Sequence, residues 1–218
     1  MRPPESGWRF VNPTGTIFDM ALGVVILGAG ASARMGRPKL LLPWNGATII
    51  GHLIRQWRGL GAAQITVVHR PDDAPLAAEL DRLDFPRADR IENPQPERGM
   101  FSSIVCAAGW PGWKNEISNW AIVLGDQPHL RLETLRALLD FSAQNPRTIC
   151  QPEFAGHARH PVILPRPAFE ELKTSTVGEL KNYLKLTSCR HLQCSLKDAG
   201  LALDLDSPED YSRAQTVE

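Results

Sequence analysis

The strongest constraint on the fold is a regular alternation between short apolar runs and segments with helical periodicity. The runs Leu22–Leu27 and Asn119–Leu124 are apolar almost throughout, which is typical of strands covered on both faces. Further strand-like runs lie at Gln64–His69 and residues 88–92, and helical spacing is present at residues 48–60, 74–83, 102–108 and 132–141. This order predicts an α/β fold in a single domain: a doubly wound, mostly parallel sheet with flanking helices.

The first 19 residues lie outside this alternation. Three prolines and two glycines interrupt them and no hydrophobic period is visible, so we expect an irregular N-terminal arm over residues 1–19. The domain itself is expected over residues 20–218, a length that suits one hydrophobic core. An ordered arm packed on the domain is the alternative, and Met20 is a second candidate for the start of the chain.

Composition excludes several classes of function. The 24 basic and 24 acidic residues cancel, which argues against a nucleic-acid-binding surface as the main function. No run approaches the ~20 apolar residues of a membrane span, and the N-terminus lacks the pattern of a secretory signal. The four cysteines are irregularly spaced, so we expect reduced thiols and a cytoplasmic location. Cys189, His191 and Cys194 offer only three soft ligands in a strand-like segment, and we expect no structural metal there.

A glycine-rich turn follows the first apolar run, and three interpretations of it compete. Gly28-x-Gly30-x-x-Ala33 fits a dinucleotide-binding fingerprint, which requires a helix starting inside the motif and an acidic residue about 20 positions later. Pro38 and Pro43 interrupt any long helix, and the segment about 20 positions later is helical and uncharged. A P-loop is excluded because no Gly-Lys-Ser/Thr follows. The third interpretation is a loop that binds a triphosphate.

Two cations favour that third interpretation. Arg34 and Lys39 bracket the loop and can neutralise a triphosphate from two sides. The stretch Arg34-Met35-Gly36-Arg37-Pro38-Lys39, followed by Leu-Leu-Leu-Pro, resembles the nucleotide loop of the molybdenum cofactor cytidylyltransferases. These belong to a larger superfamily of sugar-nucleotide and molybdopterin nucleotidyltransferases, and the resemblance implies their Rossmann-like nucleotidyltransferase fold.

Carboxylates follow at two further places. Asp126 closes the second buried run, where a Mg²⁺ ion that bridges triphosphate oxygens would lie, because Mg²⁺ needs only one or two carboxylates besides phosphates and water. Asp204 and Asp206 lie on one face of an extended segment, before a final helix that Ser207 and Asp210 are expected to cap. Both segments resemble motifs of the same family, and we assign Asp126 and Asp206 as the Mg²⁺ ligands, ahead of Asp204.

Two more segments resemble the family. Asn93-Pro94 and Gly99-Met100-Phe101-Ser102-Ser103 match its base and ribose segment: a turn at Gly99 lets backbone groups reach the base, and Ser102 can cap the next helix. The segment around His160-Pro161 resembles the family's acceptor side. The resulting assignments are Lys39, Arg34 and Asp126 as catalytic residues; Leu27, Gly28, Ala29, Gly30, Arg34, Lys39, Asn93, Gly99, Met100, Ser102 and Ser103 for the nucleotide; Asp126 and Asp206 for Mg²⁺; and His160 and Gln127 for the acceptor.

The resemblance implies a magnesium-dependent nucleotidyltransferase. It would transfer a nucleoside monophosphate, from CTP in preference to GTP, to the phosphate of molybdopterin and release pyrophosphate, and a molybdoenzyme that receives the cofactor is a candidate partner. The alternatives are a guanylyltransferase for the same cofactor and a cytidylyltransferase for a sugar or polyol phosphate. A non-catalytic nucleotide-binding chaperone for a molybdoenzyme is the alternative from another class.

Overall fold

An eight-stranded sheet forms the centre of the molecule in the computed structural model, which describes residues 8–11, 17–30 and 38–216. The strand order is β10-β9-β11-β8-β3-β6-β7, and β12 pairs with β9. The strands are β3 (Leu22–Leu27), β6 (Gln64–His69), β7 (Arg90–Glu92), β8 (Asn119–Leu124), β9 (Ile149–Phe154), β10 (His157–Ala158), β11 (Val162–Pro165) and β12 (His191–Ser195). The predicted mostly parallel α/β sheet in a single domain is confirmed.

The parallel part of the sheet determines where a ligand can bind. β8, β3, β6 and β7 are parallel neighbours, and Leu27 at the end of β3 is in register with Val68 and Leu124. The chain leaves β3 toward β6 and β7, then returns to the other side of β3 as β8. In sheets of this kind, the carboxyl ends of the strands open a crevice at the point where the strand order reverses. That point lies here between β3 and β8.

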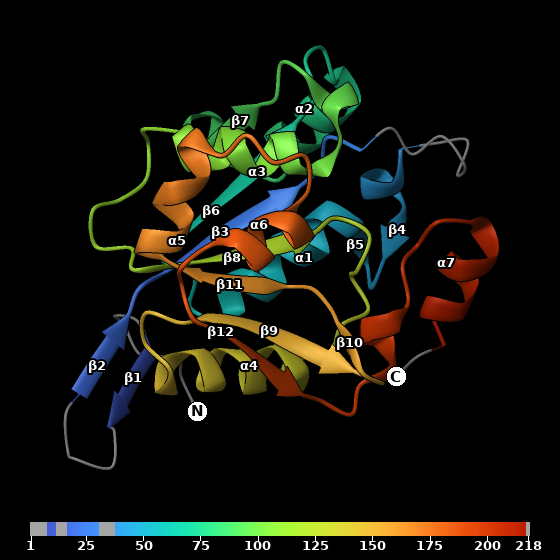
Figure 1. Cartoon of the computed structure of the whole chain (residues 1–218). Coiled ribbons are helices and arrows are strands. Elements are labelled where there is room, and N and C mark those ends of the chain that lie inside the picture. The colour runs from blue at the N-terminus through green and yellow to red at the C-terminus, as the bar shows by residue number, and fades with distance from the viewer. Residues whose placement is uncertain (1–7, 12–16, 31–37, 217–218) are drawn as a thin grey trace.

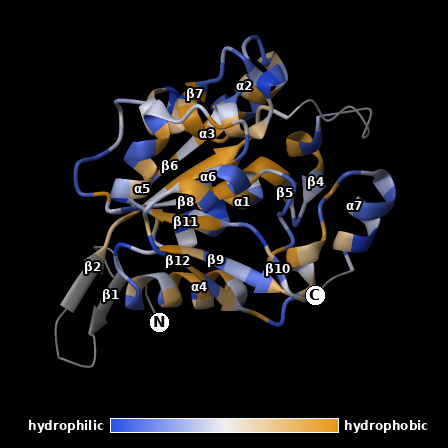
Figure 2. Cartoon of the chain, viewed as in Figure 1, coloured by the Kyte–Doolittle hydropathy of each residue, from blue (hydrophilic) through white to orange (hydrophobic). Residues whose placement is uncertain are grey.

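Two layers of helices enclose the sheet (Figure 1). Helices α1 (Ile49–Gly59), α2 (Ala74–Arg82) and α4 (Leu132–Gln144) cover one face, and α3 (Met100–Gly109), α5 (Arg166–Glu171) and α6 (Leu180–Leu186) cover the other. Because side chains alternate along a strand, Val24 and Ile26 of β3 pack into the first layer and Val25 packs into the second. Figure 2 shows how the apolar residues concentrate on the central strands.

The remaining elements are short. They are the strands β4 (Pro43–Trp44) and β5 (Ala47–Thr48), the helix α7 (Pro208–Ala214), and 3₁₀ helices at Lys39–Leu41 (η2), Arg87–Asp89 (η3), Pro96–Arg98 (η4), Leu172–Thr174 (η5) and Ala199–Ala202 (η6). No helix in the described part of the chain combines the length and apolar character needed to cross a membrane.

The N-terminal segment differs from the irregular arm that we expected. β1 (Trp8–Val11) and β2 (Ile17–Met20) pair as antiparallel strands, and β1 lies beside α4. Both segments are rich in aromatic and β-branched residues, which favour strands. The prolines and glycines on which the expectation of an irregular arm was based lie outside these two strands.

Candidate functional site

A cavity of about 560 Å³ opens at the carboxyl ends of the parallel strands. Ten residues assigned from the sequence line it: Leu27, Gly28, Ala29, Gly30, Lys39, Gly99, Met100, Ser103, Asp126 and Asp206. They come from the ends of β3 and β8, from η2, from the start of α3 and from the segment before α7. The cavity therefore lies at the crevice that the strand order predicts.

Two glycines let the strand ends approach each other in the floor of this cavity. The amide of Gly28 donates a hydrogen bond to the carbonyl of Val68 at 2.8 Å. A Cβ atom on Gly28 would lie 3.0 Å from that carbonyl oxygen, and one on Gly125 would lie 2.7 Å from the carbonyl oxygen of Leu27. Because these neighbours are backbone atoms, they cannot move aside as a side chain would. Gly28, Gly30 and Gly125 therefore line the cavity with backbone atoms only.

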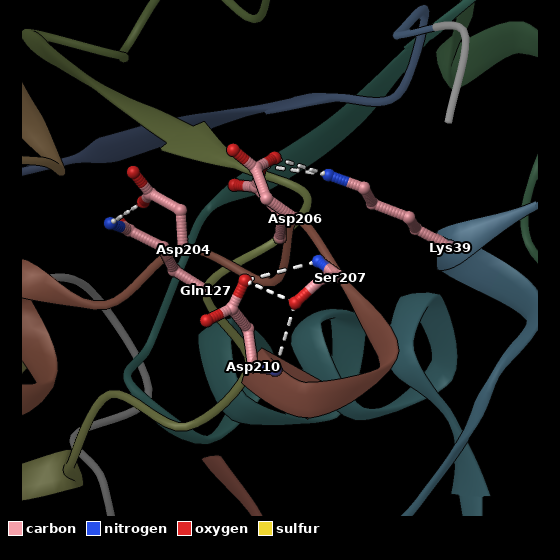
Figure 3. Close-up of polar contacts among 7 residues, drawn as sticks. Lys39, Gln127, Asp204, Asp206, Ser207 and Asp210 are labelled. Atoms are coloured by element: carbon pink, nitrogen blue, oxygen red, sulfur yellow. Dashed lines mark hydrogen bonds and ion pairs between the residues drawn. The ribbon is translucent and has the colours of Figure 1, made fainter. Parts of the chain in front are cut away.

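Lys39 lies between two carboxylates in this cavity. Its Nζ is 2.8 Å from Oδ1 of Asp206 (Figure 3). The same Nζ is 3.7 Å from Oδ2 of Asp126. Burial raises the pKa of Asp126, and the negative charge of Asp204 raises it further, while the Lys39 ammonium opposes both effects. The carboxylates of Asp126 and Asp206 thus converge on one point, where they stabilise a positive charge.

The carboxylates suit one particular kind of metal site. In the described part of the chain, no group of three or more His, Cys, Asp or Glu side chains is arranged to hold a metal ion. Asp126 and Asp206 are two oxygen ligands that already share one cation, the Lys39 ammonium. Mg²⁺ is commonly held by one or two carboxylates together with substrate phosphates and water. The residues present therefore fit Mg²⁺ brought with a triphosphate better than a metal held by the protein alone.

The neighbouring backbone fixes the position of the carboxylates. Ser207 and Asp210 form the predicted cap of α7: the Ser207 Oγ accepts from the Asp210 amide at 3.2 Å, and the Ser207 amide donates to Asp210 Oδ2 at 3.1 Å (Figure 3). The amide of Leu205 donates to the carbonyl of Asp126 at 3.2 Å, which joins this segment to the end of β8. Asp206 lies between these two attachments.

The structure gives Asn93 and Ser102 different surroundings from those we predicted. Asn93 is 1% exposed and donates to Ser102 Oγ at 2.8 Å and Ser103 Oγ at 2.9 Å, while its Oδ1 accepts from the Gln95 amide. The prediction that Ser102 caps the next helix is wrong, because α3 begins at Met100 with the positive-φ residue Gly99 at the cap position. Asn93 and Ser102 lie outside the cavity lining and join the segment after β7 to α3.

The two residues assigned to the acceptor also lie outside the lining of the cavity. Gln127 is 4% exposed, and its amide donates to Asp204 Oδ1 at 2.8 Å (Figure 3). His160 is half-buried, with Nδ1 3.5 Å from the carbonyl oxygen of Ile122, and burial lowers its pKa. Acceptor binding by Gln127 and His160 stays a prediction, and Arg34 lies outside the described residues.

The cavity also contains charged residues that the sequence did not identify. Arg70 and Glu97 line it and were not identified. Asp204 was identified but ranked behind Asp206, and it lines the cavity as well. Arg70 directly follows β6, so it occupies the same kind of position at a strand end that identified Asp126. The signal was therefore present in the sequence for Arg70. Glu97 lies in η4 and gave no such signal.

A family model, a curated relative and solved structures all show similarity between this chain and nucleotidyltransferases. Residues 24–191 match the family model of the MobA-like NTP transferase domain. The chain is 25% identical over 198 residues to the molybdenum cofactor cytidylyltransferase of Escherichia coli strain K12, which covers 89% of this chain and 96% of that protein. Among solved structures, the rv0371c homolog from Mycobacterium sp. strain JC1 is similar at 25% identity and a TM-score of 0.69, over 89% of this chain and 94% of that one. A nucleotidyl transferase from Methanothermobacter shares the fold, with 18% identity and a TM-score of 0.73 over 89% of this chain and 96% of its own.

Proposed function

The chain belongs to the MobA-like NTP transferase family, and we propose that it transfers CMP from CTP to the phosphate of molybdopterin, releasing pyrophosphate. A nucleotidyltransferase activity follows from the family. The observation that supports the catalytic site is the convergence of Asp126 and Asp206 on the ammonium of Lys39, in the cavity that Gly28 and Gly30 also line. The name of the E. coli relative supports CTP and the molybdenum cofactor as substrates.

The proposed reaction needs positioning and charge stabilisation more than covalent catalysis. A phosphate oxygen of the acceptor attacks the α-phosphorus of the NTP, and the bond to the leaving pyrophosphate breaks. Asp126 and Asp206 would hold Mg²⁺, which neutralises charge on the phosphate oxygens. Lys39 would exchange its carboxylate partners for phosphate oxygens and stabilise their charge. Arg34 would also stabilise charge on the phosphates. The backbone of Gly28 and Gly30 lines the cavity where the phosphates would approach.

No nucleophilic side chain is required, because the acceptor phosphate is already anionic. Cys106 is half-buried, packs beside the core and has its pKa raised by burial, so we assign it a structural role. The four cysteines are unpaired, which supports the further proposal that the enzyme works in a reducing compartment such as the cytoplasm.

Pyrophosphate release tests the proposal. The full chain with Mg²⁺ is assayed against CTP, GTP, ATP and UTP, each with molybdopterin and with sugar or polyol phosphates. We expect turnover with molybdopterin and a kcat/KM for CTP at least about tenfold above that for GTP. Turnover with GTP alone would indicate a guanylyltransferase, and turnover only with sugar or polyol phosphates would identify a different acceptor. Nucleotide binding without pyrophosphate would favour a non-catalytic chaperone.

Asp126→Ala provides the decisive variant. Because Asp126 lies at the end of β8 and not in the core, we expect the fold to persist while turnover falls far more than tenfold. Asp140→Ala, on α4 and outside the cavity lining, is the matched control and should retain activity. Turnover of Asp126→Ala within about tenfold of wild type, a barrier change near 1.4 kcal/mol, would contradict the assignment.

A further inference from the structure

The cavity crosses four neighbouring strand ends, and its two ends carry different charges. In sheet order, Asp126 follows β8, the glycine turn follows β3, Arg70 follows β6, and the segment with Glu97 follows β7. Neighbouring strands lie about 4.8 Å apart, so the ends of β8 and β7 are separated by roughly 14 Å. Three carboxylates and Lys39 gather at the β8 end, whereas Arg70 and Glu97 lie toward the other end.

Arg70 and Glu97 are available to a ligand. Both are exposed and line the cavity. Among the described residues, neither side chain has a hydrogen-bond or ion-pair partner. The bond between the Gly28 amide and the Val68 carbonyl fixes the end of β6 beside the turn after β3, and Arg70 follows Val68 by two residues. A planar fork of N–H donors and a carboxylate acceptor, on segments that follow the neighbouring strands β6 and β7, therefore line one cavity.

We infer that Arg70 and Glu97 together distinguish cytosine from uracil, an inference that rests on the proposed nucleotidyltransferase function. Cytosine presents two acceptors, O2 and N3, beside the amino group at N4. A guanidinium can donate two parallel hydrogen bonds to the acceptors, and a carboxylate can accept from the amino group. Uracil carries an N–H at position 3 and a carbonyl at position 4. It therefore presents a donor to Arg70 and an acceptor to Glu97, and both contacts are mismatched.

The position of these residues favours contact with the base over contact with the phosphates. The carboxylates that fit a Mg²⁺-bound triphosphate lie two strands away from Arg70, at the end of β8. Beside Glu97 lie the backbone of Gly99 and the side chain of Met100, which is 43% exposed and offers apolar surface to a flat ring. Cytosine and uracil have the same size, so the shape of the cavity cannot separate them. Hydrogen bonding must provide the difference.

Binding measurements test this inference without an acceptor. Isothermal titration calorimetry of the full chain with Mg²⁺ and either CTP or UTP gives the ratio of the two Kd values. We expect wild type to bind CTP at least about tenfold more tightly than UTP. Glu97→Gln replaces an acceptor by a group that can donate to the uracil carbonyl, so the ratio should fall below about threefold. Arg70→Ala should weaken CTP binding more than UTP binding.

Two control variants resemble these changes but alter residues outside the cavity lining: Glu92→Gln on β7 and Arg98→Ala on η4. Both should keep the wild-type ratio. Equal Kd values in wild type, an unchanged ratio in Glu97→Gln, or equal weakening of both nucleotides by Arg70→Ala would overturn the inference and leave the proposed function intact. If neither nucleotide binds, the proposed function fails as well.

Discussion

At the scale of single residues, Gly125 has no room for a side chain. A Cβ atom there would lie 2.7 Å from the Leu27 carbonyl oxygen and 2.8 Å from Leu40 Cδ2. We expect Gly125→Ala to lower the free energy of unfolding by about 1–3 kcal/mol, because the backbone of β3 cannot move without disturbing the sheet. Urea denaturation measures this. Gly109→Ala is the control: nothing lies within 4 Å of its Cβ position, so stability should stay the same or rise by up to about 1 kcal/mol.

The position of Lys39 leads to a prediction about substrates. Its ammonium reaches both carboxylates at the end of the cavity assigned to the triphosphate. Charge-assisted hydrogen bonds contribute about 1.5–3 kcal/mol, so Lys39→Ala should weaken NTP binding by about 10- to 100-fold. The KM for the acceptor should change by less than about threefold. Steady-state kinetics with each substrate varied in turn give both values, with Lys181→Ala on α6 as control. A raised acceptor KM with unchanged NTP kinetics would mean that the turn after β3 binds the other substrate.

At the scale of elements, the start of α7 links stability to the site. The Ser207 side chain caps the helix immediately after Asp206. Loss of an N-cap costs about 1 kcal/mol, so Ser207→Ala should lower the free energy of unfolding by that amount and weaken Mg²⁺·NTP binding. Ser212→Ala is the matched control, because Ser212 lies in the same helix and its hydroxyl donates only to the Pro208 carbonyl. Equal effects of the two changes in urea denaturation would show that the cap does not stabilise this segment.

The central strands were predictable because each is a buried apolar run that ends at a change in composition. Leu22–Leu27, Gln64–His69 and Asn119–Leu124 have the predicted bounds in the structure. β9 and β11 were not predicted, because they contain Pro152 and Pro165, and proline cannot donate to a ladder. On the β11 side of β9 the register consists of one pair, Ile163 with Cys150, and Pro152 lies beyond it, so no ladder bond to β11 is lost there. On the other side, Pro152 is in register with Cys194 of the parallel strand β12.

The lining of the cavity was predictable where one segment supplies both the sequence motif and the side chain, as for Lys39 and Asp126. It was not predictable where the arrangement of the strands determines which side chains meet. Arg70 and Glu97 lie on segments that only the strand order brings to one cavity. The nucleotide-binding role assigned to Asn93 stays a prediction, but its burial and its hydrogen bonds to Ser102 and Ser103 could not be predicted from the sequence. Burial of a polar side chain depends on tertiary packing, which a local motif does not contain.

At the scale of the whole molecule, one buried and two half-buried histidines connect stability to pH. Burial lowers the pKa of His52, His129 and His160 below the ordinary value of 6.5. The native state therefore takes up fewer protons than the unfolded chain once the pH falls below about 6.5. The stability that these groups contribute is present above that pH and is lost as the pH falls toward their native pKa values. Burial raises the pKa values of Asp126 and Asp140, so their contribution to stability decreases as the pH rises, opposite to that of the histidines. A comparison of variants is therefore more informative than the dependence of wild-type stability on pH alone.

His129 provides the cleanest test of this coupling. It is 6% exposed, its Nε2 lies 2.9 Å from the Gly200 carbonyl oxygen, and its Nδ1 is a buried atom for which the described residues provide no hydrogen-bond partner. Protonation would place a positive charge in the interior, and burial opposes this more strongly than the nearby Asp198 and Asp204 carboxylates favour it. Each unit of pKa shift corresponds to about 1.4 kcal/mol. We expect the free energy of unfolding of wild type, measured in urea, to fall between pH 7.5 and 5.5. In His129→Gln, whose amide can still donate to Gly200, that fall should be smaller. His157→Gln on β10 changes an exposed histidine and should keep the wild-type difference. If His129→Gln loses as much stability on acidification as wild type does, His129 is not a source of the pH dependence.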